Sequence, residues 1–277
     1  MTDPLPHHTR LTASGAEPDR WLAVLHGIYG TGRNWASVLR RVVDRRPEWG
    51  ALLVDLRGHG GSTDLPGPAT LEGAADDVRR LADAMDGEVA AVLGHSFGGK
   101  VALTLARSPW SGLRAVWVVD SDPGAGDPAA AGGAAWRMLE ILRDHPGPFP
   151  TRESAVEALV SRGLDAPVAR WMAMNVEEDD FGGWSWRIDP DVMESLLRDF
   201  FSTDAWDVVE SPPDELHIHL VEATESGVLG EEARRRMEEA GDRAGAEGRT
   251  RLHRVPGSHW VNVDNPDAVV ELLAEEL

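Results

Sequence analysis

The chain has 277 residues, of which 42% are hydrophobic and 27% charged, so it can bury the core of one large α/β domain or of two small ones. Its 47 acidic residues outnumber 27 lysines and arginines and give a net charge of −20, which is the wrong sign for binding nucleic acid. The sequence holds no cysteine, which excludes disulfides, thiol nucleophiles and Cys-based metal sites. A small neutral or cationic ligand suits this composition better.

The N-terminal stretch has no apolar core long enough for a signal peptide. No run approaches the roughly 18 apolar residues that a membrane-spanning helix needs. We therefore expect a cytoplasmic protein without membrane insertion. The sequence leaves its oligomeric state open.

Apolar runs alternate with helical patterns along the first part of the chain. Four runs are apolar throughout and read as buried strands, namely Trp21–Gly27, Ala51–Leu56, Val89–Gly94 and Leu113–Asp120. Helical spacing of apolar residues follows the first three runs, in Asn34–Arg46, Leu71–Met85 and Phe97–Ser108. Strands that are apolar on both faces and alternate with helices predict an α/β fold, with a mostly parallel sheet covered by helices on both sides.

This alternation stops after the fourth run. Residues 124–213 contain no long apolar strand, but they carry helix-like pieces and five of the eleven tryptophans. The alternation then resumes with two strands and two helical stretches, at Leu216–Ala223, Glu231–Ala244, Thr250–Val255 and from Pro266 onward. We therefore predict one core built from residues 1–123 and 214–277, with residues 124–213 inserted as a helical cap.

The stretch GHSFGGK joins the third predicted strand to a helix and admits two interpretations. A phosphate-binding loop would need Ser or Thr after the lysine to hold magnesium, and Val101 stands there. A nucleophile elbow instead places Ser96 in a tight turn that exposes its hydroxyl, with Gly94 and Gly98 leaving room for close packing. The helix N-terminus near Phe97 adds positive potential where an oxyanion would form. The elbow explains more of the stretch, and a nucleotide-binding site is the alternative.

Two other stretches could supply partners for such a serine. HGIYG follows the first long strand, where the second oxyanion donor is expected, so the N–H groups of Ile28 and Phe97 would form the oxyanion hole. His259 lies in the loop after the last predicted strand, and that loop can lie over the elbow. Taken alone, each stretch could equally be an ordinary turn or a surface histidine.

With these stretches the chain resembles the α/β-hydrolase superfamily over nearly its whole length. The matching blocks are LHGIYG, DLRGHGGS, LGHSFGGKVAL and GSHWVNVDNPDAV. GHSFGGK and the WSWRID of the cap resemble in particular the small serine esterase branch, which includes bacterial acyl-ester hydrolases and a mitochondrial lipid hydrolase of this fold. The resemblance implies an α/β-hydrolase fold and a Ser-His-acid catalytic triad.

The acid of that triad must orient the imidazole and stabilise its charged form. The esterase branch places an Asp at the end of the strand after the elbow helix, which matches Asp120, 24 positions after Ser96. Asp122 is its near rival. Many α/β hydrolases use an acid after the penultimate strand, where Glu225 stands. We expect Asp120 and keep the other two as alternatives.

Aromatic side chains of the loops and the cap could wall an apolar acyl pocket, although many would serve equally as the core of the cap. The pocket residues that we predict are Tyr29, His95, Trp136, Trp171, Trp184 and Trp260.

The sequence therefore predicts a serine hydrolase that cleaves a small or medium apolar carboxylic ester, or a thioester, through an acyl-enzyme. Ser96, His259 and Asp120 would form the triad, and no metal or other cofactor is implied. Carbon–carbon bond hydrolysis and cofactor-free perhydrolysis remain open, because the same triad supports both. A non-catalytic ligand-binding protein of this fold is the alternative from another class, although such proteins usually lose a triad member.

Overall fold

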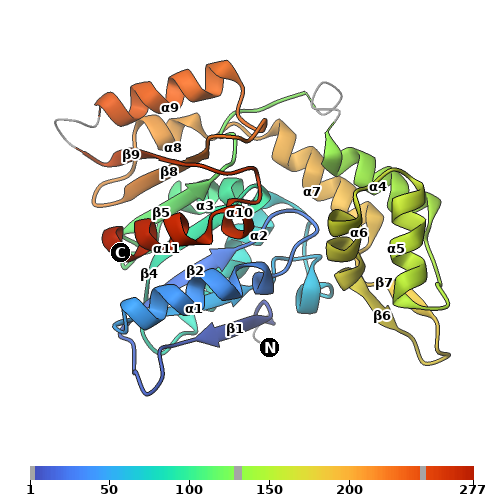
Figure 1. Ribbon diagram of the computed structural model, residues 1–277. Helices are drawn as coiled ribbons and strands as arrows, with labels where there is room; N and C mark the ends of the chain where they lie inside the picture. The colour runs from blue at the N-terminus through green and yellow to red at the C-terminus, as the bar shows by residue number, and fades with distance from the viewer. Residues whose placement is uncertain (1–3, 128–132, 244–247) are drawn as a thin grey trace.

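A seven-stranded sheet forms the centre of the computed structural model, which describes residues 4–127, 133–243 and 248–277 (Figure 1). The strand order is β1-β3-β2-β4-β5-β8-β9. All neighbours in the sheet are parallel except β1 and β3. The strands are β1 (His8–Leu11), β2 (Arg20–Leu25), β3 (Trp49–Val54), β4 (Glu88–His95), β5 (Ala115–Val119), β8 (His217–Ala223) and β9 (Thr250–Val255).

Helices cover both faces of this sheet, as the unbroken apolar runs predict. Successive strand residues point to opposite faces, so Leu22 and Val24 belong to one core while Ala23 and Leu25 belong to the other. The first core is closed by α1 (Ala36–Arg45) and α11 (Pro266–Glu276), and the second by α2 (Leu71–Asp83), α3 (Phe97–Ala106) and α9 (Glu231–Arg243). The predicted α/β fold with a mostly parallel sheet is confirmed.

The edge strand β1 was not predicted. Its four residues are mostly polar, and among them only Leu11 is buried. Antiparallel pairing with β3, from His8 opposite Val54 to Leu11 opposite Ala51, makes it a strand. The short helices η1 (Gly32–Trp35), η2 (Gly60–Ser62) and α10 (Val261–Asp264) lie in loops around the sheet.

A group of helices lies between β5 and β8 in the chain and stands to one side of the sheet in Figure 1. Its elements are α4 (Ala134–Asp144), α5 (Arg152–Ser161), α6 (Ala166–Met172), η3 (Ala173–Asn175), the hairpin β6 (Val176–Glu178) and β7 (Trp184–Trp186), and α7 (Pro190–Ser202). The hairpin was not predicted. The last helix before β8, α8 (Trp206–Glu210), packs against α3 and α9 and so lies on the core.

The parallel strands bring distant loops together. The register aligns Leu25 with Gly94, His95 with Val119, Val119 with Val221 and Ala223 with Val255, so β2, β4, β5, β8 and β9 end at one edge of the sheet. In open α/β sheets, ligands bind in the crevice beyond the carboxyl ends of the strands. Within the described ranges, no helix is long and apolar enough to cross a membrane.

Candidate active site

Ser96 occupies a strained turn between β4 and α3. Its backbone angles are φ 53° and ψ −117°, a region that side chains other than glycine rarely adopt. A Cβ atom on Gly94 would lie 2.0 Å from the Gly98 oxygen, and one on Gly98 would lie 2.5 Å from the Leu25 oxygen. Only glycines therefore allow strand and helix to approach this closely, and the turn pushes the serine out of the sheet.

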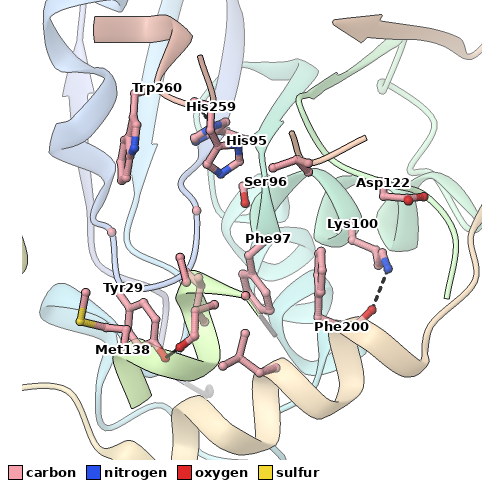
Figure 2. Close-up of a pocket in the computed structure, with 18 of the residues that line it drawn as sticks. Tyr29, His95, Ser96, Phe97, Lys100, Asp122, Met138, Phe200, His259 and Trp260 are labelled. Atoms are coloured by element: carbon pink, nitrogen blue, oxygen red, sulfur yellow. Dashed lines mark hydrogen bonds between the residues drawn. The ribbon is translucent and has the colours of Figure 1, made fainter. Parts of the chain in front are cut away.

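Ser96 opens onto a cavity of about 630 Å³, shown in Figure 2. The loops at the carboxyl edge of the sheet supply one wall. The helices α4, α6 and α7 supply most of the apolar side chains on the other walls, which are Met138, Val168, Trp171, Leu197, Phe200 and Phe201. A cavity of this size, mostly apolar with a few polar groups, is typical of a small-molecule site.

His259 lines the same cavity and is bound to a buried carboxylate. Its Nδ1 lies 2.7 Å from Asp120 Oδ2, and Asp120 is fully buried. Burial alone would raise the pKa of this carboxyl, but hydrogen bonds from His259 and Ser226 outweigh it and hold the pKa below its usual value. With Nδ1–H donated to a carboxylate, the neutral ring keeps Nε2 free to accept a proton. Among the described residues Ser96 and His259 share no hydrogen bond, and such contacts are often long before substrate binds.

His95, immediately before the serine, holds the main chain of the histidine loop. Its Nε2–H donates to the His259 carbonyl at 2.8 Å, and the two rings lie 4.7 Å apart. Burial, together with the neighbouring His259, lowers the pKa of His95 to about 3, so the ring is neutral. The contact ties two loops that are 164 positions apart in the chain.

Ser226 is a site residue that the sequence did not reveal. Its hydroxyl donates to Asp120 Oδ2 at 2.6 Å, the same oxygen that His259 contacts. It comes from the loop after β8, which also carries Glu225. Glu225 itself is exposed, and its N–H donates to the Gly257 carbonyl. Ser226 lies 106 positions from Asp120 in the chain, and no pattern in the sequence around it indicates that the two residues meet.

Two main-chain N–H groups beside Ser96 have no partner in the described part of the chain. They belong to Ile28 and Phe97, and both residues line the cavity. The loop before Ile28 touches the serine closely, since a Cβ on Gly27 would lie 3.3 Å from Ser96 Cβ. Free N–H groups at such positions can stabilise an oxyanion.

The peptide that carries the Ile28 N–H is held from its other end. Its carbonyl, that of Gly27, accepts the His26 Nδ1–H at 2.8 Å and the Gly30 N–H at 3.0 Å. His26 Nε2 in turn accepts the Leu56 N–H at 3.0 Å, and burial lowers the pKa of His26, so its neutral tautomer is fixed. In a trans peptide the N–H points opposite to the carbonyl, so these bonds aim the Ile28 N–H.

Tyr29 connects this loop to α4 and η3. Its N–H donates to His59 Nε2 at 3.0 Å, and its hydroxyl donates to the Ala135 carbonyl of α4 at 2.8 Å. The Tyr29 carbonyl accepts the side-chain N–H of Asn175 at 2.8 Å. The loop beside Ser96 is therefore fixed relative to the helices that wall the cavity.

Four of the six predicted pocket residues line the cavity, and two do not. Tyr29, His95, Trp171 and Trp260 lie on its wall. Trp136 instead packs against Phe201 and beneath Arg198, and Trp184 lies in β7, where Arg152 stacks on it. For these two residues the prediction was wrong, because their rings pack against other side chains of the helical group between β5 and β8. Within the described ranges no cluster of three His, Asp or Glu side chains could hold a metal ion.

The fold and the serine elbow define a class of protein, the α/β hydrolases. A model of the alpha/beta hydrolase family matches residues 22–272, and the chain therefore belongs to that family. The resemblance inferred from the sequence is confirmed, and the protein is a hydrolase of this family.

Curated relatives include lipases and a synthase. The chain is 28% identical over 195 residues to the sn-1-specific diacylglycerol lipase ABHD11 of Danio rerio, covering 69% of this chain and 60% of that protein. It is 37% identical over 112 residues to the 2-succinyl-6-hydroxy-2,4-cyclohexadiene-1-carboxylate synthase of Klebsiella pneumoniae (strain 342), covering 40% and 42%. The chain spans about three fifths of the length of the first curated relatives it matches.

Solved structures show the same fold. A marine microorganism esterase superposes with a TM-score of 0.81 at 21% identity and covers 99% of both chains. An E-2-(acetamidomethylene)succinate hydrolase superposes with a TM-score of 0.72 at 20% identity over 98% of both chains.

Proposed function

We propose that the protein is a serine hydrolase that cleaves a small or medium carboxylic ester through an acyl-enzyme. The observation that carries this proposal is the 2.7 Å contact between His259 Nδ1 and Asp120 Oδ2, in a cavity onto which the strained Ser96 also opens. Nucleophile, base and orienting acid are the three groups that acyl transfer requires.

The reaction has two halves. Ser96 Oγ attacks the ester carbonyl while His259 Nε2 takes its proton, and the oxyanion that forms accepts hydrogen bonds from the Ile28 and Phe97 N–H groups. The imidazolium returns the proton to the departing alcohol oxygen, which leaves an ester between Ser96 and the acyl group. Water, deprotonated by His259, then attacks that ester, and the imidazolium returns the proton to Ser96 Oγ as the bond between Ser96 and the acyl group breaks and the carboxylic acid leaves. Asp120 keeps its charge throughout and stabilises the imidazolium. Each oxyanion donor contributes about 3–4 kcal/mol in comparable sites.

The walls of the cavity favour an apolar acyl group. Most of the side chains from α4, α6 and α7 that face it are aliphatic or aromatic. We propose that α4 to α7, within the segment 124–213 that was predicted as a cap, form a cap that sets the acyl pocket, whereas α8 belongs to the core. The lipase names among the curated relatives are consistent with an ester substrate. The cytoplasmic location stays a prediction.

Carbon–carbon bond hydrolysis is a second candidate, because some curated relatives are named as a synthase of a succinyl carboxylate. A carboxylate-bearing substrate calls for a cation that can donate to it. Among the described residues, the lysine or arginine that lines this cavity is Lys100, and its three N–H groups are all engaged with main-chain carbonyls. The ester is therefore the better-supported substrate.

Labelling with a fluorophosphonate probe tests the proposed function. Wild-type protein and the control Ser161→Ala, which changes an exposed serine in α5, are expected to label equally. Ser96→Ala is expected to remain unlabelled while staying folded. p-Nitrophenyl esters of increasing acyl length then define the substrate. Folded wild-type protein that neither labels nor cleaves any of these esters would contradict the proposal.

A further inference from the structure

Asp122 places a carboxylate on the wall of the catalytic cavity (Figure 2). In the view of Figure 2 it lies to the right of Ser96, on the side away from Tyr29 and Trp260. One of its oxygens, Oδ1, accepts the Gly124 N–H at 2.8 Å. Within the described part of the chain no ion pair or hydrogen bond engages the other oxygen.

The nearby cation does not satisfy this carboxylate. Lys100 Nζ donates to the carbonyls of Gly124, Phe200 and Thr203 at 2.8, 2.7 and 3.1 Å, and it lies 4.1 Å from the centre of the Phe200 ring. An ammonium group has three N–H donors, so none is left for Asp122 or for a ligand. Lys100 therefore offsets part of the negative charge of Asp122 through space, but it forms no hydrogen bond with that carboxylate.

A carboxylate in this position is costly for the protein. The cavity is mostly apolar, and burial raises the pKa of Asp122 above its usual value while the Gly124 N–H and Lys100 oppose the rise. Asp122 is only partly buried, and its second oxygen is not among the buried polar atoms that lack a partner, so this oxygen remains accessible to a ligand. An acceptor oxygen left open inside a substrate cavity has an obvious use, which is to bind a donor on the substrate.

We propose that Asp122 is a specificity-determining residue that accepts a hydrogen bond from a hydroxyl or ammonium group of the substrate. This proposal rests on the proposed ester hydrolysis and names its substrate class, an apolar ester that carries a hydrogen-bond donor away from the scissile bond. A substrate carboxylate at the same place is rejected, because it would face Asp122 and find no free N–H on Lys100. The net charge of −20 also disfavours the approach of a substrate that carries a carboxylate.

Two series of matched esters test this proposal. In the acyl series, p-nitrophenyl esters carry six-carbon acyl chains that end in methyl, hydroxyl, ammonium or carboxylate. In the alcohol series, octanoate esters carry four-carbon alcohols that end in methyl, hydroxyl or carboxylate. The quantity measured is kcat/KM for each ester divided by that of the methyl-ended ester. In at least one series we expect wild-type protein to favour the donor-ended ester by about tenfold and to disfavour the carboxylate.

Asp122→Asn keeps an acceptor for the Gly124 N–H and removes the charge. It is expected to reduce the preference for the donor at least fivefold and to raise the relative rate of the carboxylate ester. The matched control is Asp204→Asn, which removes an exposed carboxylate that influences Asp122 through space but does not line the cavity. The control should leave all ratios unchanged. Within the acyl series, an ammonium favoured over a hydroxyl identifies a cationic substrate, and a hydroxyl favoured over an ammonium identifies a neutral one.

The proposal is overturned if wild-type protein shows no preference for donors in either series, a result that needs no variant. It is also overturned if Asp122→Asn keeps the wild-type ratios. Either result, obtained while methyl-ended esters are still cleaved, leaves the proposed hydrolase intact. Loss of all cleavage and all fluorophosphonate labelling would instead count against the hydrolase itself.

Discussion

Replacing Ser226 by alanine tests how the carboxylate of the site is held. The change removes a hydroxyl that donates at 2.6 Å to Asp120 Oδ2, between two buried side chains. A hydrogen bond to a charged group contributes about 1.5–3 kcal/mol. Because Asp120 keeps its contact with His259, we expect the transition state of the reaction to be destabilised by only about half of this hydrogen-bond energy. A loss of about 0.8–1.5 kcal/mol corresponds to a fall in kcat of roughly four- to twelvefold.

The same change should lower the unfolding free energy by about 1.5–3 kcal/mol at pH 7. The pKa of Asp120 is held below its usual value in the folded protein. Its contribution to stability is therefore present above the pKa of the unfolded chain, about 3.9, and is lost as the pH falls through the folded value. The deficit of Ser226→Ala should stay constant from pH 8 to about 5 and shrink below about 4.

Steady-state kinetics with a p-nitrophenyl ester and urea unfolding at several pH values measure both effects. Ser161→Ala, in α5, serves as the control and should match wild type in both measurements. A folded Ser226→Ala protein with wild-type kcat would refute the reasoning, because the hydroxyl would then contribute nothing to the position or charge of Asp120.

Three further predictions follow from the same geometry. Asp120→Asn should lower kcat by roughly 10³- to 10⁴-fold, while Glu225→Gln should stay within about twofold; the opposite order in an ester assay would assign the acid to the loop after β8. Gly94→Ala would place a methyl group 2.0 Å from a carbonyl oxygen of the elbow helix and should cost about 3–5 kcal/mol in urea unfolding, whereas Gly230→Ala, with open space around it, should stay within about 0.5 kcal/mol. Burial lowers the pKa of Lys100 to about 8, so as the pH rises the folded protein releases this proton before the unfolded chain does. Between pH 8 and about 10 the unfolding free energy of wild type should therefore rise relative to that of Lys100→Met. A constant difference in unfolding free energy over that range would show that Lys100 does not titrate there.

The sequence by itself determined the architecture and the elbow, because both depend on residues that are close together in the chain. Strands buried on both faces need unbroken apolar runs, and these runs are visible without any structure. The elbow needs Gly94 and Gly98 on either side of Ser96, since a Cβ at either glycine would meet main-chain atoms. The short Gly-x-Ser-x-Gly pattern therefore suffices to predict the strained turn.

Only the tertiary structure decided which distant groups meet. By residue type alone, Asp120, Asp122 and Glu225 are all carboxylates that could serve as the acid. The pairing of β5 with β8 and of β8 with β9 brings Asp120 beside His259. The same pairing delivers Ser226 across 106 positions.

The roles of the tryptophans between β5 and β8 likewise could not be read from the sequence. Trp136 and Trp171 have the same chemistry and both lie in helices between β5 and β8, yet only Trp171 lines the cavity. Whether an aromatic ring fills a core or lines a pocket depends on the direction in which its helix packs. That direction is set by contacts between elements, which no short stretch of sequence contains.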